Sequence, residues 1–143
     1  MQHPIRITEH YLIRLRPLLE SARRLLPGDR QYLELLNEKL EMAEIVEEER
    51  VPAEQATINS TLRFTNLDTG QKGQYKLVFP RDARLEENRV SVLSPLGAAL
   101  FGHLSGDVVE WTAPGGRKHF RLEEVNQEAS ASERESHAGG KAA

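Results

Sequence analysis

The sequence contains no cysteine, few aromatic residues and no long apolar run. The lack of cysteine excludes disulfide bonds, thiol nucleophiles and thiolate metal ligands. Aromatic residues make up 6% of the 143 residues, which argues against an aromatic-lined ligand pocket. No stretch approaches the roughly 18 apolar residues of a membrane span, and the N-terminus has no apolar core of signal-peptide length. We therefore expect a soluble cytoplasmic protein that does not bind membranes.

The charge balance also narrows the classes of partner. The formal net charge is −3 at pH 7, which argues against direct, sequence-specific binding of nucleic acid. Any association with DNA would be indirect. The length allows one ordinary domain, or two small units that each have a thin core.

Residues 1–50 have the pattern of two helices. Thr8 is a suitable N-cap, and Pro27 and Gly28 interrupt the helical pattern before Asp29 can cap a second helix. The apolar spacing is that of a short coiled coil, with seam positions at Tyr11, Leu15, Leu18, Ala22 and Leu25, and then at Leu33, Leu36, Leu40, Ala43 and Glu47. We predict an antiparallel hairpin of two helices, each about 27 Å long at 1.5 Å per residue.

Two features of this hairpin limit its independence. Pro17 lies inside the first helix, where a proline removes one backbone hydrogen bond. The seam is also too short to be stable in isolation. The hairpin must therefore pack against the rest of the chain or against another molecule.

From residue 58 the pattern changes to the period of two that is typical of strands. Residues 51–57 read as a linker, residues 58–125 as an α+β domain with a bent antiparallel sheet, and residues 126–143 as a disordered tail without apolar periodicity. The expected strands are residues 61–67, 73–80, 89–93, 107–113 and 118–125, with a tight "PGG" turn between the last two.

The stretch "SPLGAALFGHLSGD", residues 94–107, is apolar and rich in small residues. Ser94 is a good N-cap, Pro95 fits the first helical position, and Gly102 can end a helix in the left-handed conformation. We predict one short helix that covers the sheet. A phosphate-binding loop is excluded because no Lys-Ser or Lys-Thr follows the glycines.

The segment from the third to the fourth expected strand resembles the C-terminal domain of the Gre-type (GreA/GreB) transcription elongation factors. The matching positions are Ser94, Pro95, Leu96, Gly97, Ala98, Leu100, Gly102, Gly106, Asp107, Pro114 and Gly115. The resemblance implies an FKBP-like α+β fold preceded by a helical hairpin. It also implies binding to bacterial RNA polymerase at the secondary channel, with Ser94, Pro95 and Leu96 near the contact.

The hairpin departs from the Gre pattern. Gre factors have a longer hairpin whose tip carries two acidic residues that help to hold a catalytic magnesium ion and stimulate transcript cleavage. The tip here has one acid, Asp29, among Arg23, Arg24 and Arg30, and such a carboxylate is more suited to ion pairing than to chelation. Residues 30–125 are more similar to the Rnk proteins, regulators of nucleoside diphosphate kinase that bind polymerase and lack the acid pair.

These comparisons lead to a prediction and two alternatives. We expect a non-enzymatic, monomeric RNA polymerase-binding regulator with no cofactor and no metal, which competes with other factors for the secondary channel. The first alternative is a Gre-like factor that stimulates cleavage through Asp29. The second is a prolyl isomerase, which rests on fold analogy alone.

Other polar groups have simpler explanations. The acidic run is expected to be the solvated face of a helix and comprises Glu41, Glu44, Glu47, Glu48 and Glu49. The five histidines lack the spacing of a zinc site: His3, His10, His103, His119 and His137. Trp111 alternates with Val109 on a strand and is expected in the core.

Overall fold

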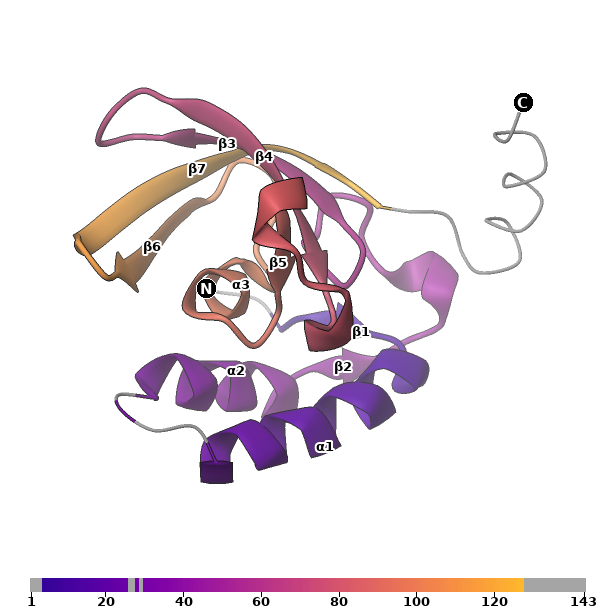
Figure 1. The fold of residues 1–143 in the computed structure, drawn as a ribbon. Helices are drawn as coiled ribbons and strands as arrows, with labels where there is room; N and C mark the ends of the chain where they lie inside the picture. The colour runs from indigo at the N-terminus through magenta and orange to yellow at the C-terminus, as the bar shows by residue number, and fades with distance from the viewer. Residues whose placement is uncertain (1–3, 26–27, 29, 128–143) are drawn as a thin grey trace.

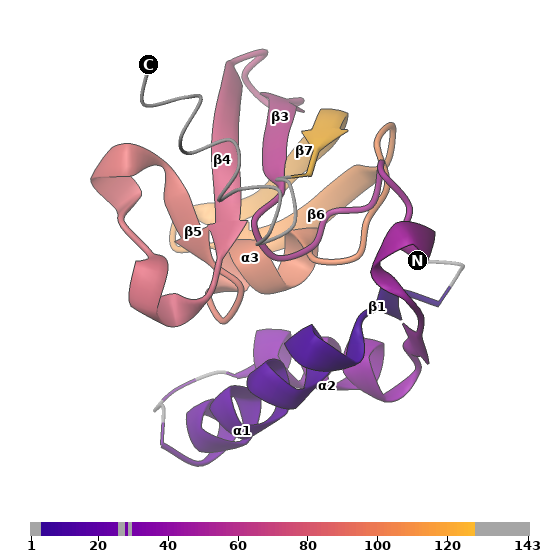
Figure 2. The same cartoon turned by 90° about the vertical axis from the view of Figure 1, so that its right-hand side faces the viewer.

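The protein is built from a five-stranded sheet, a short helix beneath it and a pair of longer helices beyond that helix (Figures 1 and 2). The computed structural model describes residues 4–25, 28 and 30–127. Within these ranges, no helix is long and apolar enough to cross a membrane.

The helical pair consists of α1 (Glu9–Leu25) and α2 (Gln31–Glu41). Thr8 starts α1 as predicted: its carbonyl accepts from the Leu12 amide at 3.1 Å, and its hydroxyl accepts from the Tyr11 amide at 3.4 Å. The helix continues through Pro17 to its predicted end. The second helix is shorter than predicted, since its 11 residues correspond to about 16 Å of helix rise.

The early end of α2 has a structural cause that the sequence pattern did not indicate. After α2 the chain becomes extended and forms β2 (Glu44–Ile45), which pairs in parallel with β1 (Arg6–Ile7). The Glu44 amide donates to the Ile5 carbonyl at 2.8 Å. Positions 43 and 47 therefore cannot belong to a helical seam, and a short 3₁₀ turn, η1 (Glu48–Arg50), follows.

The main sheet has the strand order β5-β4-β3-β7-β6. Its strands are β3 (Thr61–Asn66), β4 (Lys72–Val78), β5 (Arg89–Ser91), β6 (Val108–Ala113) and β7 (Gly116–Asn126). All five lie where the alternating pattern predicts strands. A register shift between Arg63 and Phe64 interrupts the pairing of β3 with β7.

The prediction of a purely antiparallel sheet is wrong for one pair, because β5 runs parallel to β4. A tight turn would have reversed the chain. Instead, residues 79–88 form a longer connection through the 3₁₀ turns η2 (Pro80–Asp82) and η3 (Leu85–Glu87). This connection brings the chain back to the level of Lys76, so that β5 runs beside the last three residues of β4 in the same direction.

The helix α3 (Pro95–Leu100) lies between the sheet and the helical pair (Figures 1 and 2). Toward the sheet, Leu96, Ala99 and Leu100 pack with apolar side chains of β3, β6 and β7. The predicted apolar face of this helix is confirmed. Toward the helical pair, Ala98 and the following residue Phe101 enter a second buried cluster.

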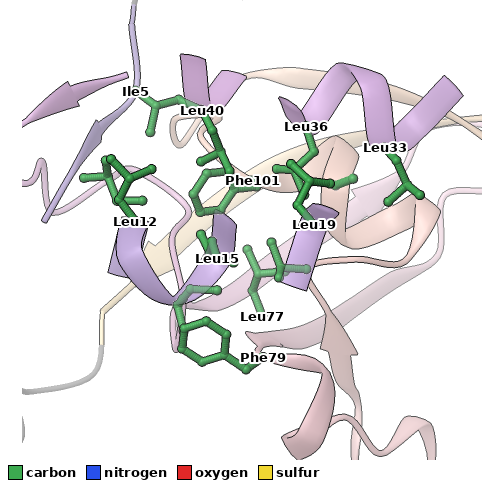
Figure 3. Close-up of a cluster of buried hydrophobic side chains, with 14 of the residues drawn as sticks. Ile5, Leu12, Leu15, Leu19, Leu33, Leu36, Leu40, Leu77, Phe79 and Phe101 are labelled. Carbon is green, nitrogen blue, oxygen red and sulfur yellow. The ribbon is translucent and has the colours of Figure 1, made fainter. Parts of the chain in front are cut away.

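That second cluster joins the helical pair to the rest of the protein (Figure 3). Leu15 of α1 and Leu36 of α2 are fully buried together with Leu77 of β4 and Phe101. The hairpin therefore packs against the chain's own second half. The sequence argument that it needed such support is confirmed.

The predicted seam of α1 is partly wrong. Leu12 and Leu19 are buried, whereas Leu18 is 38% exposed and Leu25 is 76% exposed. A seam between two helices requires one narrow stripe of apolar residues on each helix. Here α1 packs against α2 and also lies against Phe79, which contacts Tyr11 and Arg14. The buried stripe is consequently rotated relative to the coiled-coil pattern.

The segment between the helical pair and the sheet is well packed. Gln55, Ala56, Thr57 and Ile58 are buried, and Gln55 forms an isolated bridge with Leu104. At the other end of the chain, β7 continues through Asn126. The tail beyond Gln127 lies outside the described residues.

Candidate partner-binding site

The corner formed by Ser94 and Pro95 begins α3. The Ser94 hydroxyl accepts a hydrogen bond from the Gly97 amide at 3.0 Å and donates one to the Ser91 carbonyl at 2.7 Å. Pro95 occupies the first helical position, where its missing N–H has no cost. The predicted N-cap is confirmed, and the two hydrogen bonds of Ser94 hold the strand-to-helix turn in place.

The next two residues of the motif lie inward. Leu96 is only 8% exposed and packs in the sheet cluster. Gly97 lies against the end of β5, so that a Cβ atom at this position would be 1.9 Å from the Ser91 carbonyl oxygen. Of the three predicted contact residues, Pro95 has the exposed side chain, Ser94 is half-buried and Leu96 is in the core.

The hairpin tip was the second predicted site. Arg23 makes a two-point contact with Glu34, from Nε to Oε2 and from NH2 to Oε1, both at 3.0 Å. Its NH1 atom also lies 3.3 Å from Glu20. Arg23 therefore joins the end of α1 to the start of α2, and it engages both of these carboxylates.

Of the other three predicted tip residues, the structure describes Arg24 and Arg30. Arg24 is exposed. Arg30 donates from NH1 to the Arg23 carbonyl and occupies the N-cap position of α2 without a side-chain cap. Asp29 lies outside the described residues.

A third cluster, which the sequence did not indicate, surrounds Lys39. This residue is 8% exposed, and its Nζ atom donates to the carbonyls of Ala98 at 2.8 Å, Ala99 at 3.1 Å and Phe101 at 2.8 Å. Burial lowers the pKa of Lys39 from 10.5 to about 7. Sequence reasoning missed it because a lysine on an amphipathic helix is normally solvated.

His103 lies close to this cluster. Its Nδ1 atom is 3.0 Å from Oδ2 of Asp107, and the same carboxylate oxygen accepts from the Leu104 amide at 3.0 Å. Burial lowers the pKa of His103, the charge of Lys39 acts in the same direction, and Asp107 opposes both. The Asp107 side chain thus holds the turn that leads into β6.

The remaining polar groups lie mostly at the surface. All five glutamates of the acidic run are exposed, although only Glu41 belongs to a regular helix. His119 contacts Asp68 and Glu110, while His3 and His137 fall outside the described residues. In the part of the chain that the structure describes, no three His, Asp or Glu side chains are grouped as metal ligands would be.

Trp111 packs as predicted with the core. Its ring lies edge-on to that of Phe120 with a centroid distance of 5.9 Å, and it borders the sheet cluster. Phe120 also stacks on Phe64 at 4.4 Å, and Phe64 stacks on Tyr75. These rings support one another in a continuous aromatic array on the α3 side of the sheet.

Comparison with known proteins identifies the second half of the chain. Residues 51–127 match the family described as transcription elongation factor, GreA/GreB, C-term. The regulator of nucleoside diphosphate kinase from Escherichia coli K12 is 34% identical over 97 residues, which cover 67% of this chain and 71% of that protein. Transcription elongation factor GreA from Thermotoga neapolitana is 35% identical over 86 residues, covering 60% of this chain and 54% of the relative.

The similarity extends to the arrangement in space. The structure of the prokaryotic transcription elongation factor GreA/GreB from Nitrosomonas europaea has a TM-score of 0.73 and 32% sequence identity, over 87% of this chain and 99% of that one. The family match spans all five strands of the main sheet and the α3 motif. The chain belongs to the GreA/GreB C-terminal domain family.

Proposed function

We propose that this protein is a cytoplasmic transcription regulator that binds RNA polymerase at the rim of the secondary channel and does not stimulate transcript cleavage. The observation that carries the proposal is the family match over residues 51–127. The similarity to a regulator of nucleoside diphosphate kinase supports a related regulatory role for this chain. In this proposal the protein is a monomer and not an enzyme, and its association with DNA is indirect, through polymerase.

The proposed docking surface is the corner at Ser94 and Pro95, in a domain that we take to have the FKBP-like fold of Gre factors. The exposed ring of Pro95 supports this choice, because the hydrogen bonds of Ser94 hold that ring at a fixed place on the surface. Leu96 contributes indirectly, since its burial anchors the first turn of α3.

The helical pair supports the cleavage-free mode. At about 16 Å by helix rise, α2 provides little reach into a channel. The carboxylates Glu20 and Glu34 are paired with Arg23, which opposes their use as magnesium ligands. A hairpin of this kind would occupy the channel entrance and exclude competing factors without adding ligands to the polymerase metal site.

Three assays test the proposal. Core RNA polymerase should retain the wild-type protein in a pull-down, and the protein should displace a bound Gre factor in a competition experiment. Backtracked elongation complexes should show no faster RNA cleavage on its addition. Asp29→Asn is the matched variant: stimulated cleavage that this change abolishes would support the Gre-like alternative, and no retention by polymerase would reject the proposal itself.

A further inference from the structure

Lys39 connects α2 to the end of α3, two elements that are far apart in the sequence. Its Nζ atom lies within 3.1 Å of three carbonyl oxygens, those of Ala98, Ala99 and Phe101. The backbone amides that could have bonded to two of these carbonyls are used otherwise: the Gly102 amide donates to Ala56, and the His103 amide donates to Leu100 and not to Ala99. Lys39 therefore satisfies carbonyls at the helix end that are normally left without an intrahelical partner.

The chemistry of lysine suits this position. The ammonium form has three N–H donors, one for each carbonyl, and its positive charge is favourable at a helix C-terminus. The long apolar stem can pass between the neighbouring leucines of α2 while the amino group reaches the backbone. A residue without donors would leave three buried acceptors unpaired, which is costly.

The surrounding contacts are apolar and have little directional preference. Leu36 and Leu40 of α2 share a buried cluster with Phe101 (Figure 3). Apolar contact favours the association of α2 with α3, but it permits sliding and rotation more readily than hydrogen bonds do. The three hydrogen bonds of Lys39 are the directional element of this interface.

A second buried polar contact lies at the base of the helical pair. The Gln55 side chain donates from Nε2 to the Arg6 carbonyl at 2.8 Å and accepts from the Arg6 amide at 3.1 Å. Arg6 belongs to β1, which pairs with β2 at the end of the helical pair. Gln55 thus holds the helical pair at one point, and Lys39 holds it at a second. With the Gln55 contact alone, the helical pair could pivot about that point, and the Lys39 hydrogen bonds oppose this motion.

We propose that Lys39 is a positioning residue, which fixes the direction of the helical pair relative to the C-terminal domain. Its consequence for binding rests on the proposed function. If Pro95 docks on polymerase while the helical pair meets the channel, both surfaces must be presented in one geometry. Lys39 would set that geometry from a buried position, without touching polymerase.

The orientation can be measured directly because the chain has no native cysteine. Spin labels at Ser21→Cys on α1 and Thr112→Cys on β6, both exposed sites, report the distance between the helical pair and the sheet by double electron–electron resonance. The test variant is Lys39→Met, which keeps the stem and removes the donors. The matched control is Lys72→Met, the same substitution at an exposed lysine of β4.

We expect one narrow distance distribution for the doubly labelled parent protein and for the Lys72→Met control. Lys39→Met should broaden or shift this distribution by several ångströms while circular dichroism shows a folded protein. Polymerase affinity should fall roughly tenfold if about one molecule in ten keeps the competent orientation. Lys39→Gln, which restores two N–H donors, should recover part of the narrow distribution.

The outcomes separate the two proposals. An unchanged distribution in folded Lys39→Met would overturn the positioning role. The positioning role would also be wrong if neither Lys39 variant folded, since the residue would then act in folding. A changed distribution with unchanged polymerase affinity would reject the link to binding, and an absence of polymerase binding by the wild-type protein would reject the proposed function and leave the measured orientation effect intact.

Discussion

Gly97 approaches the carbonyl group of Ser91 so closely that a Cβ atom at position 97 would lie 1.9 Å from the carbonyl oxygen. The contact joins the first turn of α3 to the end of β5 and is made with backbone atoms. The backbone here is also held by the two hydrogen bonds of Ser94. The glycine of the Ser-Pro-Leu-Gly motif is therefore a packing requirement of the fold.

Gly97→Ala should destabilise the protein by about 3 kcal/mol, the upper part of the usual range for overpacking, because a rigid backbone carbonyl must move. Urea unfolding of the two proteins measures the difference. Gly115→Ala is the control, since a Cβ atom at position 115 would meet no atom within 4 Å. Equal stability of Gly97→Ala and the wild-type protein would contradict the packing argument.

The predicted docking corner must be tested at Pro95. Pro95→Arg should leave the melting temperature nearly unchanged because this side chain is exposed, and it should weaken polymerase binding at least about tenfold if the ring lies at the centre of the contact. Pro114→Arg places the same bulk at another exposed proline and should not affect binding. Equal affinity of the two variants would remove the corner from the interface.

Leu96 needs a different interpretation from Pro95. Because it is buried in the sheet cluster, Leu96→Asp should cost about 3 kcal/mol or more by placing a carboxylate in an apolar site. Loss of binding in that variant would report unfolding. A thermal melt distinguishes unfolding from the loss of a direct contact with polymerase. A folded Leu96→Asp protein with a wild-type melting temperature would contradict the burial argument.

Local signals predicted the short helix well. Ser94, Pro95 and the small residues after them specify α3 through capping, a fixed φ angle and one apolar face. Gly102 has the positive φ of 90° that was expected where the helix ends. Each of these signals acts over a few residues, so the sequence alone contains them.

Long-range contacts explain what the sequence did not predict. The burial of Leu19 in place of Leu18 follows from the contact of α1 with two different neighbours. The strands β1 and β2 have two residues each and depend on pairing across the whole helical pair. Lys39 is buried because its acceptors come from residues 98–101, and no local pattern contains that information.

Truncation can locate the end of the folded chain. Removing residues 128–143 should change the melting temperature little, because their composition offers almost no apolar area to bury. Removing Asn126 and Gln127 as well should cost about 1 kcal/mol. Gln127 donates from Nε2 to the carbonyl of Pro52 at 2.7 Å and to that of Gln55 at 3.2 Å, and Asn126 pairs with Thr61. A fall of many degrees after the first truncation would show that the tail packs on the domain.

The burial of Lys39 makes stability depend on pH in a characteristic direction. Its pKa is lowered from 10.5 to about 7 in the folded protein, so unfolding takes up a proton between these values and stability rises with pH in that window. Below pH 7 both states carry the charge, and the destabilisation from burying it is fully present. The slope cannot exceed about 1.4 kcal/mol per pH unit for one proton.

The contribution of Lys39 to this pH dependence can be isolated by replacing it with a residue that does not titrate. Between pH 7 and 9 the wild-type protein should gain about 2 kcal/mol of unfolding free energy relative to Lys39→Met in urea titrations. Lys39→Arg, which stays charged, serves the same purpose if the methionine variant does not fold. His103 faces Lys39 and is bonded to Asp107, but its lowered pKa places its titration below this window. Parallel pH profiles for the wild-type and variant proteins would contradict this prediction and show that Lys39 keeps its charge in the folded protein. The hydrogen bonds to the carbonyls of Ala98, Ala99 and Phe101 would then offset the cost of burying that charge.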